Sequence, residues 1–241
     1  MAAIKPLSMM KAELPPEPEG PFDFLMSQKE ISSRTLLAFF IALTAISFSL
    51  YQVFTGHFIQ PRPHAHRSIH LSFALILSFL MFPLGRKSFK DKLNLYFLVD
   101  ATLILLVVGF EAWIIWDLDA FLEKEGMLSW LDQLFIMLYL ATILEATRRS
   151  VGWPLVWVTL FFIVHSFFAP YFPGILNGPA ASREWFFEAQ VIQPYGVFSI
   201  PLAVVASYVA LFIIFSVVLN ETGAGKFFID LAVGLMGWQA G

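Results

Sequence analysis

The chain has 241 residues, of which 58% are hydrophobic and 14% charged, and its formal net charge is −3. A soluble domain carries about 45–50% apolar and about 25% charged residues, so a mean hydropathy of +0.73 argues against a soluble, very apolar helical domain. The small net charge gives no basis for a nucleic-acid partner. The sequence has no cysteine, which excludes disulfides, thiolate catalysis, iron–sulfur clusters and cysteine-based zinc sites.

Residues 1–33 are polar and contain a run rich in proline and glutamate at residues 13–19. A secretory signal would place its apolar core directly after a basic start, and this segment does not. We therefore expect residues 1–33 to form a disordered cytosolic tail.

Six apolar blocks follow, and each approaches the roughly 20 residues that a helix needs to cross a hydrocarbon core about 30 Å thick. The predicted spans are residues 35–54, 69–84, 95–116, 131–146, 151–171 and 196–219, and a seventh apolar segment begins at residue 227. The pattern predicts an all-α, polytopic helical membrane protein with about six full transmembrane helices and a partial seventh. Residues 174–195 form a mixed connector between two spans, and residues 183–192 within it fit either an interfacial amphipathic helix or a packed loop helix.

Lysine and arginine in short loops predict the orientation. The loops at residues 86–92 and 148–149 are basic, whereas the loop at residues 117–125 between them is acidic. This pattern places the basic loops and the N-terminus in the cytoplasm of a bacterial cell, with the chain in its inner membrane. The loop at residues 60–67 disagrees, because it carries Arg62 and Arg67 on the expected outer side.

The composition changes near residue 145. Charged loops separate the earlier blocks, whereas glycine and proline interrupt the apolar segments more often after that point. We therefore expect a four-helix membrane region at residues 34–144 and a second region at residues 145–241.

Three acidic residues lie in or near the predicted spans, and Glu111 is the deepest of them by sequence. Asp100 and Asp132 lie near span ends. An ionisable group at bilayer depth is costly and is a functional candidate. For Glu111 we favour a buried structural pairing and keep a proton or ion role as the alternative.

Glu145 lies four residues before Arg149 and three before Arg148, at the end of a predicted span. This spacing predicts that Glu145 pairs with Arg148 or Arg149 on a helix. The pair would be an interfacial clamp that sets helix depth, or a contact with another subunit or domain.

Four histidines, His57, His64, His66 and His70, cluster near Pro61 and Pro63. The cluster lacks a carboxylate at ligand spacing, so a capped interfacial turn is favoured over a metal site. The sequence contains no nucleophile elbow, phosphate-binding loop, dinucleotide fingerprint or zinc-protease motif. We therefore predict that the protein is not an enzyme and has no cofactor of its own.

The segment 200–230 contains the pattern most typical of a transporter. Pro201 interrupts the start of an apolar run, and Asn220, Gly223 and Gly225 form a polar turn before the next run. Interrupted helices at membrane depth mark transporter cores, although ordinary helical hairpins share this pattern.

Three groups of residues together resemble the fused membrane permeases of tripartite ATP-independent periplasmic (TRAP) transporters, in particular the TAXI subfamily. They are RSIHLSFA at 67–74, then LEATRRSVGW at 144–153 with APYFPG at 169–174, and finally GVFSIPL at 196–202 with ETGAGKFFID at 221–230. The resemblance implies a region like the small subunit, followed from about Glu145 by the start of the large, transporting subunit.

The resemblance also implies a function. In that family a periplasmic solute-binding protein delivers an organic acid, and a sodium gradient drives uptake. We expect the ion and substrate sites to lie in large-permease helices beyond this sequence, so no ligand residue is assigned and sodium is expected only in the complete transporter. The alternative is a structural scaffold that anchors a partner and transports nothing.

Overall fold

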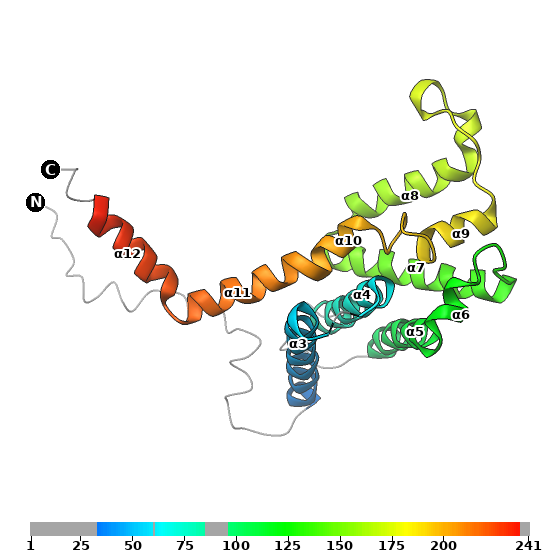
Figure 1. Cartoon of the computed structure of the whole chain (residues 1–241). Helices are drawn as coiled ribbons and strands as arrows, with labels where there is room; N and C mark the ends of the chain where they lie inside the picture. Colours follow the sequence, from blue (N-terminus) through cyan, green and yellow to red (C-terminus); the bar gives the residue numbers. More distant parts are fainter. Residues whose placement is uncertain (1–32, 60, 85–95, 237–241) are drawn as a thin grey trace, which may run out of the picture.

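The computed structural model describes residues 33–59, 61–84 and 96–236, and these residues form helices and loops without a strand (Figure 1). The predicted tail at residues 1–33 and the predicted basic loop at residues 86–92 fall almost wholly outside them. The longer helices are α3 (Ser33–His57), α4 (Pro63–Met81), α5 (Phe97–Trp116), α7 (Trp130–Ser150), α8 (Trp153–Phe168), α11 (Ala210–Glu221) and α12 (Ala224–Met236). The shorter ones are α6 (Leu118–Leu122), α9 (Arg183–Val191) and α10 (Ile200–Val204), with 3-10 turns η1 (Ala169–Tyr171) and η2 (Gly174–Leu176) and a π-helical turn η3 (Val205–Val209).

Five helical segments in the described part of the chain are long and apolar enough to cross a membrane. They are Leu37–His57, Phe97–Trp116, Trp130–Ser150, Trp153–Tyr171 and Ile200–Glu221. The prediction of a helical, polytopic membrane protein is therefore confirmed. The structure has five such segments, whereas the sequence predicted six full spans. The predicted span at 69–84 lies in α4, which is not among the five because its first two turns are polar.

Helices α4, α5 and α7 pack together around an aromatic core. The rings of Phe110 in α5 and Tyr139 in α7 stack with their centroids 3.8 Å apart, and Phe79 of α4 is equally buried. By contrast, α3, α8 and α11 expose many large apolar side chains. Because lipid chains are themselves apolar, such outward faces suit a bilayer.

The segment that joins α8 to α10 is a packed helix. Ser182 caps α9 by accepting from the backbone N–H of Trp185 at 3.2 Å, and α9 buries Phe186 and Val191 against the bundle. Of the two alternatives for this segment, the structure shows the packed loop helix.

The connection α10–η3–α11 runs as one long, irregular helix past α3 and α4 (Figure 1). Pro201 lies in the first turn of α10, where a missing N–H costs no helical hydrogen bond. The chain bends between α11 and α12 at Gly223, whose φ of 72° favours glycine. In Figure 1, α11 and α12 extend away from the bundle.

Candidate functional site

The first half of α4 carries six polar side chains in ten residues. They are His64, His66, Arg67, Ser68, His70 and Ser72. The helix starts at Pro63, whose fixed φ suits the first helical position. These side chains point to three different neighbouring elements, so α4 connects α3, α5 and the α10–η3 segment.

Two histidines of α4 bond to α3. The ring nitrogen Nδ1 of His66 lies 3.0 Å from the Tyr51 hydroxyl. Gln52 and His70 form a second, buried hydrogen bond one turn away. The two bonds hold α4 against the last turns of α3.

Two side chains of α4 bond backbone carbonyls of the segment that precedes α11. Arg67 Nη1 donates to the Phe198 carbonyl at 2.7 Å, and His66 Nε2 lies 3.1 Å from the Ala206 carbonyl. At the end of η3 the backbone N–H of Ala210 donates to the carbonyl of Val205, five residues earlier, rather than to the carbonyl of Ala206. The π-helical turn therefore frees the Ala206 carbonyl from its usual helical partner, and His66 takes its place.

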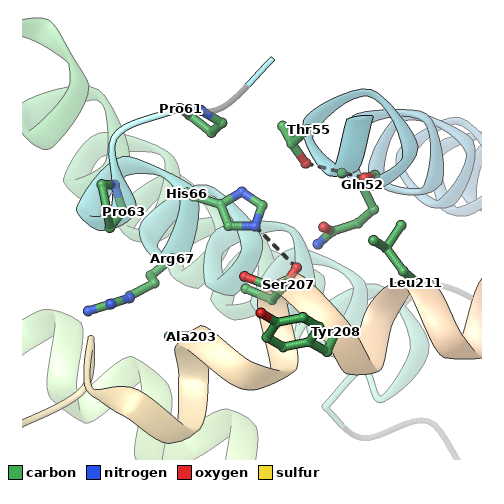
Figure 2. Close-up of a pocket in the computed structure, with 12 residues that line it drawn as sticks. Gln52, Thr55, Pro61, Pro63, His66, Arg67, Ala203, Ser207, Tyr208 and Leu211 are labelled. Carbon is green, nitrogen blue, oxygen red and sulfur yellow. Dashed lines mark hydrogen bonds between the residues drawn. The ribbon is translucent and has the colours of Figure 1, made fainter. Parts of the chain in front are cut away.

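A groove of about 360 Å³ lies between α3, α4 and η3 (Figure 2). Figure 2 shows the His66 ring pointing across it to the helix that bears Ser207 and Tyr208. Its lining residues are Gln52, Thr55, Gly56, Pro61, Pro63, His66, Arg67, Ala203, Ala206, Ser207, Tyr208 and Leu211. One cation, two hydroxyls of η3 and an amide line this groove, so it offers donors suited to a small polar or anionic group.

Glu111 lies on the other side of α4, between α4 and α5. Its Oε1 is 3.0 Å from the Ser68 hydroxyl and its Oε2 is 2.7 Å from the Ser72 hydroxyl. Within the described residues, no lysine, arginine or histidine nitrogen lies within 4 Å of this carboxyl. Glu111 is therefore partly buried, and its partners among the described residues are two hydroxyls and not a cation.

The predicted pairing of Glu145 is confirmed, and both arginines take part. Arg148 binds the carboxylate with two bonds of 2.7 and 2.8 Å, and Arg149 Nε adds a third at 2.7 Å. Arg149 also pairs with Asp100 of α5, where both side chains are buried, at 4% and 7% exposed. No local pattern predicts the Arg149–Asp100 pair, because 49 positions separate the two residues.

A second group of charges lies at the opposite ends of these helices. Arg62 pairs with Asp119 in the acidic loop, with Nη2 3.1 Å from Oδ2. This hydrogen bond holds the pKa of Asp119 below its usual value. The pair explains why the loop at residues 60–67 departs from the charge rule: Arg62 has an acidic partner on the same side, and Arg67 binds a carbonyl.

The remaining predicted site residues lie elsewhere. Asn220 is in the last turn of α11, where its carbonyl accepts from Gly223 at 3.1 Å, and Gly225 follows in α12. Pro201 is close in sequence to η3, but the structure does not bring Asn220, Gly223 and Gly225 to the groove. The π-helical turn itself was missed, because no residue type marks it.

The histidines do not converge on one point. His64 packs against the rings of Phe121 and Phe198, while His66 and His70 bond to η3 and α3. His57 ends α3 with an exposed ring. In the described part of the chain, no three histidine, cysteine, aspartate or glutamate side chains group as metal ligands.

Residues 138–241 match the family model described as Tripartite ATP-independent periplasmic transporter, DctM component. The match begins within α7 and includes the α10–η3–α11 segment, so this part of the chain is similar to the permease component of a TRAP transporter. Comparison with curated proteins and with solved structures gave no match.

Proposed function

We propose that this chain is a membrane component of a TRAP-type secondary transporter that takes up organic acids. The observation that carries the proposal is the family match over residues 138–241. On this proposal a sodium gradient drives uptake, and a periplasmic solute-binding protein delivers the substrate. Residues 34–144 act as a small-permease-like region, and residues 145–241 belong to the transporting region, as in the fused permeases of the TAXI subfamily.

The contacts of α4 support a close association of these two regions. Arg67 and His66 bind backbone carbonyls at Phe198 and Ala206, within the family-matched segment. Side-chain bonds to carbonyls require only a backbone, so they tie the two regions together whatever side chains the second region carries.

The same contacts favour a second candidate function, a scaffold that holds transporter parts in place without moving substrate. Two half-buried side chains of α4, His66 and Arg67, bond to the start of a long membrane helix, and such a connection is rigid. The two candidates differ in whether the chain is required for uptake or only for assembly.

Reconstituted vesicles would test the proposal. Uptake of radiolabelled organic acids is measured in vesicles that hold this chain, a periplasmic solute-binding protein and further large-permease helices, with an inward sodium gradient. The proposal expects uptake that stops when the gradient is replaced by equal sodium on both sides. Vesicles without this chain are the control, and equal uptake in them would contradict the proposal. The scaffold alternative predicts equal uptake once the other parts are assembled by a different anchor.

A further inference from the structure

Glu111 lies within a helix that is long and apolar enough to span a membrane, and both of its carboxyl oxygens contact serine hydroxyls of α4. A buried carboxylate is normally paired with a cation because its charge is costly away from water. The hydrogen bonds around Glu111 indicate which protonation state the site accepts.

The Ser68 hydroxyl has two possible acceptors but only one proton to donate. Its Oγ lies 3.1 Å from the Ala65 carbonyl and 3.0 Å from Glu111 Oε1. Serine in a helix commonly donates to a carbonyl of the preceding turn. If Ser68 donates to Ala65, the contact with Glu111 is a hydrogen bond only when Glu111 supplies the proton.

The second oxygen of Glu111 fits the same scheme. The Ser72 hydroxyl is 2.7 Å from Oε2 of Glu111. Ser72 therefore donates to Oε2 while a protonated Oε1 donates to Ser68. The protons of Ser68, Ser72 and Glu111 then have one acceptor each.

The titratable groups on the elements around α5 contact residues other than Glu111. On α4, His66 and His70 bond to Tyr51 and Gln52 of α3, and Arg67 bonds to the Phe198 carbonyl. His64 lies between the rings of Phe121 and Phe198. None of these groups neutralises a charge on Glu111.

The other neighbours of α5 give the same result. The charges of α6 and α7 form their own pairs, namely Arg62 with Asp119, Lys124 with Asp132, and Arg148 and Arg149 with Glu145 and Asp100. Asp117 caps the N–H of Ala120. From α7 the Tyr139 hydroxyl, which is buried without a hydrogen-bond partner, lies within electrostatic range of Glu111, as does Tyr51 from α3. A phenol adjacent to a carboxyl adds no positive charge.

We propose that Glu111 is a proton-binding site, occupied at neutral pH by a proton that Oε1 donates to Ser68 of α4. Loss of that proton would remove the bond and place an unpaired negative charge between α4 and α5. Helix α4 also bonds to the backbone carbonyls of Phe198 and Ala206. Proton binding at Glu111 therefore acts on the same helix that holds the α10–η3 segment in place.

Infrared spectroscopy of the full chain in lipid nanodiscs would test the proposal at neutral pH. A protonated carboxylic acid has a carbonyl stretch well separated from the carboxylate bands, and it shifts on exchange into deuterated water. We expect this band in the wild type, its loss in Glu111→Gln, and its retention in Asp119→Asn, where the exposed, ion-paired carboxylate contributes no such band. A wild-type spectrum without the band, or a band that Glu111→Gln leaves unchanged, would overturn the proposal.

A second variant keeps the test decisive if Glu111→Gln does not fold. Ser68→Ala retains Glu111 but removes the group that accepts its proton. The carbonyl stretch should then shift to the higher frequency of a carboxylic acid with a weaker hydrogen bond. An unshifted band in folded Ser68→Ala protein would contradict donation from Oε1 to Ser68.

Discussion

At the scale of single residues, burial separates the contacts that matter for stability from those that do not. Glu145 binds two arginines, yet Arg149 is 4% exposed and Arg148 is 28% exposed. Removing one member of a buried ion pair leaves the other charge uncompensated, whereas an exposed pair contributes little.

Arg149→Ala should therefore lower the free energy of unfolding by about 3–5 kcal/mol, because it leaves Asp100 buried and unpaired. Arg148→Ala, the matched control, should cost at most about 1 kcal/mol. Denaturant-induced unfolding in detergent measures both. Equal losses in the two variants would show that the Asp100 contact adds nothing.

At Gly196 the neighbouring backbone leaves no room for a side chain. A side chain there would collide with the backbone of Ala189 and Gln190, because a Cβ would lie closer to them than any real Cβ approaches. Gly196→Ala should destabilise the protein by about 1–3 kcal/mol, the usual range for overpacking. Gly225→Ala meets no atom within 4 Å and should be neutral or slightly stabilising in a helix. A drop in melting temperature for Gly225→Ala but not for Gly196→Ala would contradict this packing.

At the scale of elements, the sequence predicted the features that one continuous segment forms and missed the contacts between helices that are far apart in the chain. Apolar runs marked α3, α5, α7 and α8 because a span is a property of one continuous segment. The spacing of Glu145 and Arg149 predicted a pair within one helix. The Arg149–Asp100 pair, the bond from His66 to Ala206 and the π-helical turn each depend on how separate helices pack, so composition and periodicity contained no signal for them.

The bond from His66 to the Ala206 carbonyl should protect the α10–η3 segment from local opening. His66→Ala removes this bond and the one to Tyr51, each of which is worth about 0.5–1.5 kcal/mol. Backbone amides of residues 200–210 should then exchange with deuterium several-fold faster, as measured by mass spectrometry. His57→Ala, which alters an exposed ring, should leave these rates unchanged, and similar acceleration in both variants would contradict a specific role for His66.

The pair between Arg62 and Asp119 should make the contact between the α3–α4 loop and α6 sensitive to acid. Because the pKa of Asp119 is lowered in the folded protein, its stabilising effect is present above the usual carboxyl pKa and is lost as the pH falls through the lowered value. The stability difference between wild type and Asp119→Asn should shrink in acid and in high salt. A difference that grows as the pH falls would contradict the pairing.

At the scale of the whole molecule, α4 is the helix whose side chains bond to α3, to α5 and to the segment that contains Phe198 and Ala206. The predicted boundary near Glu145 stays a prediction, as do the cytoplasmic N-terminus and the inner-membrane location. The charge pattern that supports this orientation is consistent with the pairing of Arg62 and Asp119, because that pair places the loops at 58–62 and 117–125 at the same end of the bundle.

The orientation is directly testable because the sequence has no cysteine. Single cysteines at the exposed positions Ser150 and Glu123 should react differently with a membrane-impermeant thiol reagent added to intact cells. Glu123→Cys should be labelled from the periplasm and Ser150→Cys only after the membrane is permeabilised. Labelling of Ser150→Cys in intact cells would reverse the proposed topology.

The proposal that this chain works in a transporter powered by an ion gradient is tested most directly by the initial rate of uptake. The rate is measured in vesicles that contain the chain, a periplasmic solute-binding protein and further large-permease helices, while the sodium gradient is varied at constant membrane potential. The account predicts a rate that rises with the inward gradient and falls to background without this chain. Uptake that is independent of both sodium and the chain would contradict it.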